Sequence, residues 1–359
     1  MTKNKYHVIG LMSGTSLDGL DIAYCSFHYK NGKWVFEIKD SITINYSEKY
    51  EEELRNSMNF TTKNLNILDK NLGEFWGKEI NKFIINSNLE VDFICSHGHT
   101  IFHQPEKGIT LQIGNAYQIA NECNLDVISD FRTLDVKLGG QGAPLVPIGD
   151  KMLFSDYKYC LNLGGISNVS FDDNRNERRA FDISPCNLIL NHYANLLNQE
   201  FDNNGDIGKG GSINSTLLSK LNAINYYQRS TPKSLGKEDI VNIFIPTIES
   251  FDITIEDKMR TFYEHISIQI TSILNDDSTL VTGGGAYNTF LIELIKEKSN
   301  SKIIIPSDDL ISFKEAMIFA FLGVLKIRNE NNILKSYTGA SKNSSSGIIT
   351  RCKLKRIYN

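Results

Sequence analysis

The sequence predicts an α/β protein made of two copies of one unit, with a cleft between the halves. In each copy a strand, a polar glycine turn, a second strand, a turn, a third strand and a helix follow in order. The two copies lie about 155 residues apart. The length of 359 residues agrees with two domains, because a domain typically holds about 100–200 residues.

The first copy begins with a short apolar strand and a turn dense in glycine and serine. A second strand follows, and Asn31-Gly32 signals a hairpin into a third strand. The longer of the next two helices has apolar residues near a 3.6-residue spacing. In order, we expect strands at 6–12, 20–29 and 34–44, helices at 48–58 and 63–87, and a strand at 91–95.

The second copy repeats this order, and Pro185 stands at a plausible first position of its helix. A further strand then leads into a run of three glycines. The last long helix is apolar on nearly every side, which predicts burial. In order, we expect strands at 157–163, 166–171 and 179–183, a helix at 186–197, a strand at 279–282, a helix at 288–298, a strand within 301–306 and a helix at 313–327.

Composition excludes several classes of protein. Hydrophobic residues make up 41% and charged residues 22% of the chain, as in soluble globular proteins. The net charge is −4 and no basic run occurs, so no nucleic-acid partner is expected. No signal peptide is expected, and the longest apolar run, 316–325, is too short to span a membrane. Six cysteines without a CxxC pair favour a reducing, cytoplasmic compartment.

Three glycine turns follow apolar strands, at 10–21, 164–168 and 283–285. Glycine lets backbone N–H groups approach an anion closely, so these turns are candidate phosphate sites. Neither a Walker A sequence nor a strand running into GxGxxG is present, which argues against a P-loop or a Rossmann site. Asp18 and Asp21 could hold the water shell of Mg²⁺, or they could simply cap the turn.

Other polar residues stand where a strand is expected to end. His97, His99 and His103 have no further metal ligand at a suitable spacing, so contacts to a polar substrate, or a purely structural role, are favoured over a metal. Asp182 ends a predicted strand and could face a cleft or cap a turn. Arg132 offers a bidentate fork for a carboxylate. Glu315 begins the buried helix, where its charge needs a partner, either the substrate or Arg132.

The stretch GLMSGTSLDGLD at 10–21 resembles the anhydro-N-acetylmuramic acid kinase family of the actin-like sugar kinase/Hsp70 superfamily. The stretch GGQGAPLVP at 139–147 is similarly specific, and the likeness covers nearly the whole chain in order. The remaining matching positions are 96–98, Thr100, His103, 130–132, 162–168, 181–182, Asn187, Gly205, 283–285, Asn288, 315–316 and 338–340.

The resemblance implies two ribonuclease-H-like (actin-like ATPase) domains with an interdomain cleft that closes over ATP and Mg²⁺. We place the N-terminal domain at 1–125 plus 340–359 and the C-terminal domain at 126–339. The implied reaction opens the 1,6-anhydro ring of anhydro-N-acetylmuramic acid with water and phosphorylates O6. It gives N-acetylmuramic acid 6-phosphate in peptidoglycan recycling, and the implied enzyme is a cytoplasmic homodimer.

The resemblance also assigns a role to each candidate residue. Asp182 is the catalytic base, and Asp18 holds Mg²⁺ through water. The first two turns take the phosphates and the third lies by the adenosine. The nucleotide-binding residues are Ser13, Gly14, Thr15, Ser16, Asp18, Gly19, Asp21, Gly164, Gly165, Asn168, Gly283, Gly284 and Gly285. The sugar-binding residues are His97, Arg132, Gln141 and Glu315.

The chain departs from the family pattern near these residues. Ile183, Ser184 and Cys186 replace Thr, Gly and Gly beside the base; His99 replaces a Gln and Asn191 an Asp. These departures bear on rate and affinity more than on reaction type. Two alternatives remain open: an ordinary kinase of a free sugar 6-hydroxyl that uses the same Asp182, and a non-catalytic sugar-binding regulator on the same fold.

Overall fold

The computed structural model describes residues 3–14, 17–231 and 233–353, and these form two compact units. Unit 1 comprises 1–153 and 313–359, and unit 2 comprises 154–312. The predicted boundaries at 125/126 and 339/340 differ from this division. Residues 126–153 and 313–339 belong with unit 1, because β6 (Val127–Ser129) extends its sheet and α13 (Asp308–Ile327) packs against it.

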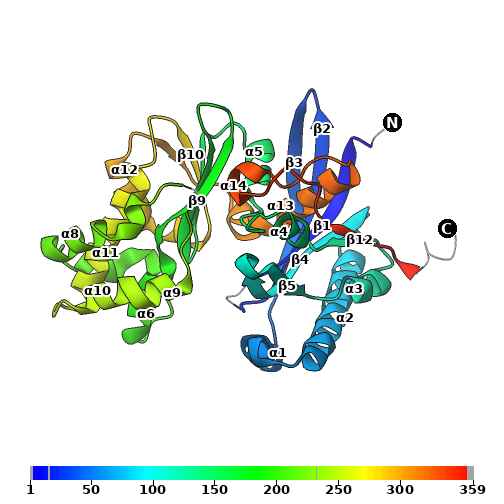
Figure 1. The fold of residues 1–359 in the computed structure, drawn as a ribbon, viewed down its shortest axis with the longest axis horizontal. Coiled ribbons are helices and arrows are strands. Elements are labelled where there is room, and N and C mark those ends of the chain that lie inside the picture. The colour runs from blue at the N-terminus through cyan, green and yellow to red at the C-terminus, as the bar shows by residue number, and fades with distance from the viewer. Residues whose placement is uncertain (1–2, 15–16, 232, 354–359) are drawn as a thin grey trace. The chain divides into compact units, whose positions relative to one another are not determined.

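The sheet of unit 1 has the strand order β12-β6-β4-β1-β2-β3, with β5 paired to β4 (Figure 1). Strands β1, β2 and β3 are successively antiparallel, whereas β4 runs parallel to β1 and β6 parallel to β4. The bounds are β1 Lys5–Ser13, β2 Leu20–Lys30, β3 Lys33–Ile44, β4 Phe93–Gln104, β5 Ile109–Ile113 and β12 Ile348–Thr350.

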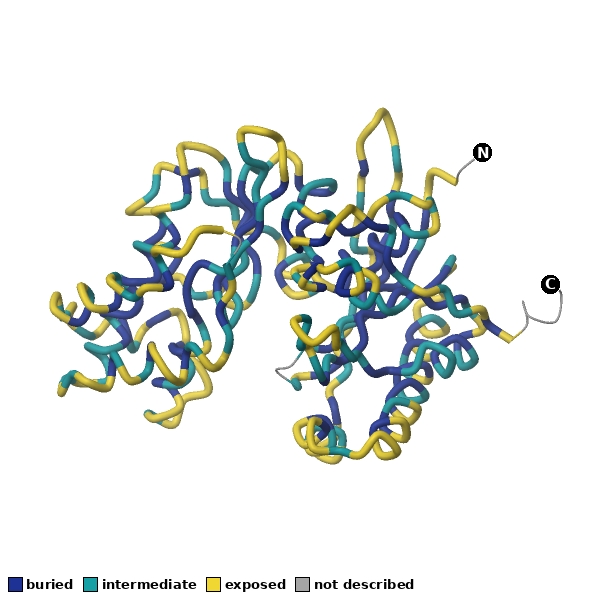
Figure 2. Tube along the Cα trace, in the orientation of Figure 1, coloured by how far each residue is buried: buried dark blue, intermediate teal, exposed yellow. Residues whose placement is uncertain are grey.

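Helices cover both faces of this sheet. Alternate β1 residues face opposite sides, so Ile9 and Leu11 join the core that α2 and α3 share, whereas Gly10 faces α13. In Figure 2 the sheet strands are mostly dark blue, while the outer side of α2 is exposed. The remaining bounds in this unit are α1 Glu48–Asn56, α2 Thr62–Asn86, α3 Ala116–Cys123, α4 Thr133–Lys137, α5 Pro147–Leu153 and α14 Lys335–Thr338.

Two glycines allow α13 to approach the sheet closely. A Cβ added at Gly10 would overlap the carbonyl oxygen of Ala316, and one added at Gly323 would overlap the sulfur of Cys95. The thiol of Cys95 also points at the carbonyl of Ala320, 3.7 Å away. Helix and strand therefore touch through backbone atoms, with no room for a methyl group.

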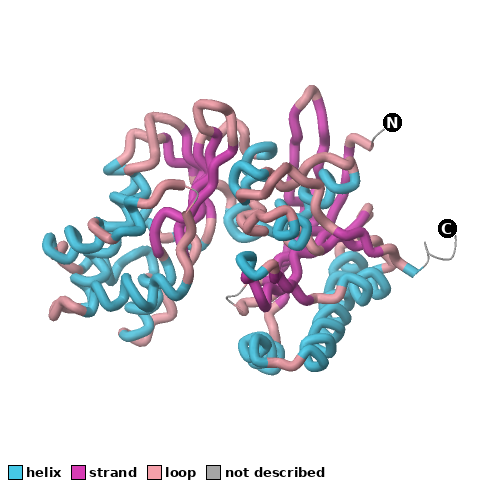
Figure 3. The backbone as a smooth tube through the Cα atoms, viewed as in Figure 1, coloured by secondary structure: helices cyan, strands magenta, loops and turns pink. Residues whose placement is uncertain are grey.

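Unit 2 repeats the topology of unit 1. Its sheet has the order β11-β10-β7-β8-β9, with β7, β8 and β9 successively antiparallel and β10 and β11 parallel to β7 (Figure 3). This matches β6-β4-β1-β2-β3 in order and direction, so the predicted duplication and the ribonuclease-H-like fold class are confirmed. The bounds are β7 Tyr159–Leu163, β8 Ile166–Asp172, β9 Arg178–Pro185, β10 Ser278–Thr282 and β11 Lys302–Ile304.

Unit 2 has its own core, in which fully buried aromatic side chains such as Tyr193, Phe262 and Tyr263 pack with the sheet. Helix α11 begins at a Thr254 cap that accepts from the backbone of Asp257. The helices are α6 Asn187–Leu196, α7 Asp206–Gly210, α8 Ser215–Asn222, α9 Lys237–Asp239, α10 Ile245–Glu249, α11 Ile255–Thr271 and α12 Thr289–Lys298.

Two local predictions are wrong. Strand β4 continues to Gln104 instead of ending at Cys95, so His97, His99 and His103 lie within a strand. The extension is stabilised by β5, which pairs with it from His99 to Gln104. Pro185 ends β9 and does not open the following helix, which begins at Asn187.

All six cysteines are free and buried. Cys25, Cys95, Cys123 and Cys352 belong to unit 1, and Cys160 and Cys186 to unit 2. Among the residues that the structure describes, no helix has the length and apolar character needed to cross a membrane.

Candidate active site

The second and third glycine turns meet in unit 2 at the start of α6. The backbone N–H of Asn187 donates to the carbonyl of Gly164 at 3.2 Å, and its side-chain amide donates to the carbonyl of Leu163 at 3.1 Å. A Cβ added at Gly285 would lie 2.7 Å from the Cβ of Leu163. The structure therefore brings together two turns that lie far apart in the sequence.

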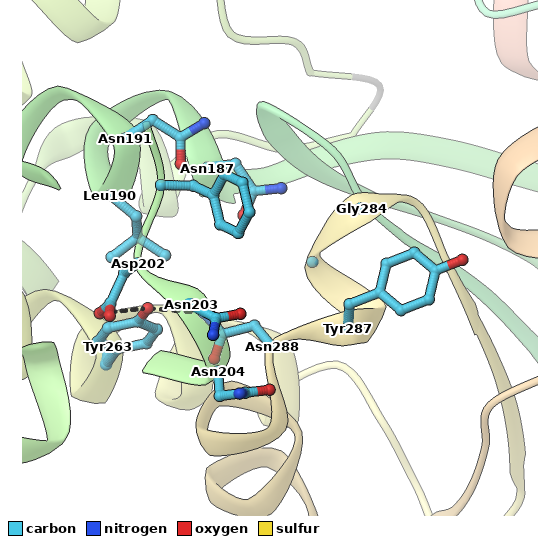
Figure 4. Close-up of a pocket in the computed structure, with 12 residues that line it drawn as sticks. Asn187, Leu190, Asn191, Asp202, Asn203, Asn204, Tyr263, Gly284, Tyr287 and Asn288 are labelled. Carbon is cyan, nitrogen blue, oxygen red and sulfur yellow. Dashed lines mark hydrogen bonds between the residues drawn. The ribbon is translucent and has the colours of Figure 1, made fainter. Parts of the chain in front are cut away.

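A cavity of about 450 Å³ opens beside these turns (Figure 4). Gly284 and Gly285 line it, whereas the lining includes none of Gly164, Gly165 and Gly283. The other lining residues are Asn187, Leu190, Asn191, Phe201, Asp202, Asn203, Asn204, Tyr263, Tyr287 and Asn288. Five of them are asparagines, so the cavity offers neutral amide donors and acceptors.

The one carboxylate of this lining is occupied by the protein itself. Asp202 accepts the N–H groups of Ile207 at 2.8 Å and Gly208 at 3.0 Å. It also accepts a hydrogen bond from the hydroxyl of Tyr263 at 3.0 Å. The hydroxyl oxygen of Tyr263 in turn accepts one from the side-chain amide of Asn288 at 2.7 Å (Figure 4). The network fixes one wall of the cavity, and the asparagines of the lining add neutral amide groups.

Gly284 is a glycine that the protein's own packing does not require. A Cβ added there would meet only the side-chain nitrogen of Asn187, 4.0 Å away. The neighbouring Gly283 must be a glycine for backbone reasons, because it has φ +82° and a Cβ there would lie 2.6 Å from Asn162 Oδ1. The missing side chain at Gly284 instead keeps the cavity open.

Asp182 lies within β9, opposite Asn168 of β8, and so beside the second glycine turn. Its Oδ2 accepts the backbone N–H of Leu235 at 2.9 Å, while Oδ1 accepts nothing from the described residues. The hydroxyl of Tyr226 donates to its backbone carbonyl at 2.5 Å. Burial raises the pKa of Asp182, and the Leu235 N–H offsets this in part. Asp182 is therefore a half-buried carboxylate with one oxygen fixed by a backbone N–H and the other without a donor among the described residues.

The first glycine turn belongs to unit 1, and Thr15 and Ser16 lie outside the described residues. Ser13 is buried, and its hydroxyl bonds with Tyr46 at 2.7 Å and His99 at 2.9 Å. Gly14 is half-buried. Gly19 has φ +145°, and a Cβ there would lie 2.6 Å from the carbonyl oxygen of Ile44. The hydroxyl of Ser13 thus points to the core, and Gly19 is required by the backbone.

The two acidic residues of this turn differ in environment. Asp18 is exposed, whereas Asp21 is half-buried and accepts the hydroxyl of Thr43 at 2.6 Å. Burial raises the pKa of Asp21, and the negative charge of Asp18 raises it further. No group of three or more His, Cys, Asp or Glu residues that could hold a metal ion occurs in the described ranges.

The burial of His99 gives stability a pH dependence. Burial lowers the pKa of His99 to about 4, so the unfolded chain, with a value near 6.5, binds more protons between pH 6.5 and 4. The free energy of unfolding should fall as the pH drops through this window. Replacing His99 by Gln should make the fall shallower by about 1–2 kcal/mol between pH 7 and 5. Urea unfolding at both pH values tests this, and parallel curves for the two proteins would contradict it.

The predicted sugar-binding residues of unit 1 occupy different settings. The Nε and Nη2 groups of Arg132 donate to Nε2 of His97 at 3.1 and 2.8 Å, and its Nη1 donates to the carbonyl of Gly142 at 2.6 Å. Gln141 is exposed, and its backbone N–H donates to the carbonyl of Thr338 at 2.8 Å. Three hydrogen bonds within unit 1 therefore hold the guanidinium of Arg132 in place.

Glu315 lies in the second turn of α13, and solvent reaches its side chain. Desolvation raises the pKa of its carboxyl, and the positive charges of Lys314 and Arg132 offset this in part. No ion pair joins it to Arg132 within 4.0 Å in the part of the chain that the structure describes. The helix buries its neighbours instead: Ala316 meets Gly10 of β1, and Lys314 pairs with Asp150 of α5 at 2.9 Å.

Several residues of these sites were not predicted from the sequence. Leu235 and Tyr226, which hold Asp182, lie more than forty residues beyond it in the chain. The asparagines at 203–204 and Asp202 lie in a segment without a recognisable motif. Asn191, noted only as a departure from a family pattern, lines the unit 2 cavity. His99, a candidate substrate contact in the sequence, bonds with Ser13.

The repeated sheet topology, with a glycine turn in the first hairpin of each copy, is that of the two-domain, actin-like fold class. A family model described as anhydro-N-acetylmuramic acid kinase matches residues 6–352. The chain belongs to the anhydro-N-acetylmuramic acid kinase family.

Individual relatives agree. The anhydro-N-acetylmuramic acid kinase of Clostridioides difficile (strain 630) is 34% identical over 375 residues, covering 95% of this chain and 97% of that protein. That of Francisella tularensis subsp. novicida (strain U112) is 33% identical over 370 residues, with the same coverage. Among solved structures, the activator of the 2-hydroxyisocaproyl-CoA dehydratase from Clostridium difficile with bound ADPNP has a TM-score of 0.44 at 14% identity, covering 90% of this chain and 97% of that one.

Proposed function

We propose that this kinase opens the 1,6-anhydro ring of anhydro-N-acetylmuramic acid with water and phosphorylates O6 with ATP, giving N-acetylmuramic acid 6-phosphate. The observation that carries the proposal is the setting of Asp182. Its carboxylate is half-buried with a raised pKa, one oxygen is held by Leu235 and the other is open. Such a group can take a proton from a bound water molecule.

The chemistry needs a single base. In the anhydro sugar O6 is bonded to C1, so no free 6-hydroxyl exists. The water oxygen forms a bond to C1 as the C1–O6 bond breaks, and O6 forms a bond to the γ-phosphorus as the bond to ADP breaks. The water proton goes to Oδ1 of Asp182. The Leu235 N–H holds Oδ2, so the open oxygen keeps a fixed direction.

The unit 2 cavity is the proposed adenosine site, and the glycine turns at 14–21 and 164–168 are the proposed phosphate-binding segments. The neutral amide lining suits a base and ribose, and Gly284 leaves space for a ligand. The phosphate roles of Gly14, Thr15, Ser16 and Asn168 remain part of this proposal. Ser13 and Gly19 would act through the shape of the turn, since the first faces the core and the second is needed by the backbone.

Two adjacent glycines separate binding from stability. Gly284→Ala should leave the melting temperature unchanged but raise KM for ATP about tenfold, because the methyl group enters the ligand's space. Gly285→Ala should instead destabilise the fold by about 1–3 kcal/mol, since its Cβ would press on Leu163. Steady-state kinetics and thermal melts test both. An unchanged KM in Gly284→Ala would show that the nucleotide binds elsewhere.

Mg²⁺ is the proposed counterion of the phosphates, held by Asp18 through water. An exposed carboxylate beside a glycine turn fits this role, because Mg²⁺ usually keeps several of its waters. Asp18→Asn should raise the Mg²⁺ concentration that gives half-maximal rate roughly tenfold. Asp309→Asn, which changes an exposed carboxylate on α13, is the matched control. Equal Mg²⁺ requirements in both variants would remove Asp18 from the proposal.

On the sugar side, His97, Arg132, Gln141 and Glu315 are proposed contacts. We further propose a cytoplasmic homodimer that works in peptidoglycan recycling. Six buried free thiols are compatible with a reducing compartment.

The decisive experiment uses isotopic water. Purified enzyme with ATP, Mg²⁺ and anhydro-N-acetylmuramic acid in H₂¹⁸O should release ADP and place one ¹⁸O at C1 and none in the phosphate. Free N-acetylmuramic acid should be a much poorer acceptor. Equal rates with the free sugar would support an ordinary 6-hydroxyl kinase, and no ADP release with either sugar would support a binding protein.

A further inference from the structure

Asp182 lies where the sheet of unit 2 fixes the backbone of β9 least. The pairing of β8 with β9 shifts between Ser167 and Asn168, so that Ile183 is an extra residue on β9. Such a bulge bends a strand and re-aims the side chains beside it. In the described part of the chain β9 is also the last strand of its sheet, so no further strand fixes its outer side. Other groups must therefore set the direction of the Asp182 side chain.

Three hydrogen bonds supply this control, and each joins a different group of Asp182 to a segment more than forty residues further along the chain. Its carbonyl accepts the hydroxyl of Tyr226, in the 3₁₀ helix η4 (Asn225–Gln228), at 2.5 Å. Its backbone N–H donates to the carbonyl of Lys233 at 3.2 Å, and Oδ2 accepts the N–H of Leu235 at 2.9 Å. Of the three partners, Tyr226 alone uses its side chain, so a substitution can remove this bond and leave the backbone intact.

Tyr226 is held at its hydroxyl and at the face of its ring. The residue is buried, and burial together with the negative charge of Asp182 raises the pKa of its hydroxyl, which therefore keeps its proton. The ammonium group of Lys233 lies over the ring, 4.7 Å from the centroid, and donates to the Tyr226 carbonyl at 3.4 Å. The hydroxyl that reaches Asp182 thus comes from a ring with a fixed position.

The next residue, Tyr227, anchors η4 to two helices of unit 2. The fully buried His265 of α11 has Nε2 at 2.7 Å from the Tyr227 hydroxyl and Nδ1 at 2.7 Å from Oδ1 of Asn222. Gln269 also donates to that Oδ1, at 2.9 Å, so His265 carries its proton on Nδ1 and accepts from Tyr227 at Nε2. Burial lowers the pKa of His265 to about 3, so the ring stays neutral. Helix η4 is therefore fixed to both α8 and α11.

A general base needs a fixed direction, because a misplacement of about 1 Å can cost about a hundredfold in rate. We propose that Tyr226 is a positioning residue for Asp182: its hydroxyl fixes the backbone beside the bulge and so directs Oδ1 at the water to be deprotonated. This inference rests on the proposed function, in which Asp182 is the base. Tyr226 acts through Asp182 and not on the reacting atoms.

The first test compares two Tyr→Phe variants. Tyr226→Phe keeps the ring beneath Lys233 and should lower kcat by roughly 10–100-fold with KM for ATP unchanged. Tyr193→Phe is the matched control, since it also removes a hydroxyl from a buried ring of unit 2, where it donates to Glu249 at 2.7 Å. It should lower the melting temperature about as much but keep kcat. Equal losses of kcat in the two variants would give Tyr226 a purely structural role.

A double variant tests whether Tyr226 acts through the base. Residues that act as a unit are not additive, so Tyr226→Phe should have no further effect on the residual turnover of Asp182→Asn. Single-turnover release of ADP measures this residual rate. The same fold-loss in the Asp182→Asn protein as in wild type would overturn the inference.

Amide hydrogen exchange gives a measurement without turnover. The N–H of Leu235, which donates to Oδ2 of Asp182, should exchange about tenfold faster in Tyr226→Phe than in wild type or Tyr193→Phe. An unchanged exchange rate would show that Tyr226 does not hold Asp182. If wild type released no ADP with either sugar, the proposed reaction would fail, and the exchange rates would still decide whether Tyr226 positions Asp182.

Discussion

Asp182→Asn is expected to lower turnover by a factor of about 10²–10⁴, the usual contribution of a general base. The amide has nearly the same size as the carboxylate, and its oxygen can still accept the N–H of Leu235. It cannot take a proton from water at the sugar C1. Because burial disfavours the anion at this position, the substitution should not lower the melting temperature.

The pH profile gives the same residue a second test. Asp182 must be ionised to act, so kcat/KM should fall as the pH drops through its pKa. That limb should lie above the value of about 3.9 for an ordinary Asp, because burial raises the pKa. Asp173→Asn on the neighbouring turn, which removes an ion pair with Arg179, should keep both rate and profile. If Asp182→Asn kept more than about a tenth of the rate, the base would have to be sought elsewhere.

Gly10→Ala is expected to destabilise unit 1 by about 3 kcal/mol, at the upper end of typical overpacking. The new methyl group would overlap the carbonyl of Ala316, and a backbone atom of a buried helix cannot turn aside as a side chain can. The melting temperature of that unit should fall by about 6–12 °C.

The control for Gly10→Ala is Gly210→Ala in α7. A Cβ there meets nothing within 4 Å, and its φ is not positive, so stability should be unchanged or slightly higher. Calorimetric melts of the two variants give the comparison. If Gly10→Ala melted like wild type, helix α13 would have to pack less closely against β1 than the structure has it.

Gly10 and Gly284 show that a sequence pattern can locate a glycine-rich stretch but cannot tell which role each glycine has. Both belong to stretches that the sequence assigns to glycine turns after strands, and that pattern favours phosphate binding, although Gly10 lies within β1. The structure separates them, since Gly10 admits a helix backbone and Gly284 borders a cavity. That distinction depends on what packs opposite each residue, which a local pattern does not contain.

The duplicated fold was predictable because strand–turn–strand patterns are local. Strand β4 was not, because its second half is stabilised by pairing with β5, and periodicity around 93–95 carries no sign of that partner. The same reason applies to Asp182. Its position followed from its motif, but the amide that holds it comes from Leu235 in another segment. Likewise, the exposure of Glu315 depends on which face of α13 packs against the sheet, and the sequence of the helix alone does not reveal that face.

The six buried thiols give each half of the molecule its own reporter. A thiol reagent can react only when the surrounding structure opens, so its labelling rate measures the local opening equilibrium. Cys95 would report on the packing between β4 and α13, and Cys186 on the segment that leads into the unit 2 cavity. Bound nucleotide should slow the labelling of Cys160 and Cys186, because it binds only the folded state of unit 2 and so makes local opening rarer. Mass spectrometry of labelled peptides would then resolve the stability of the two halves within one sample.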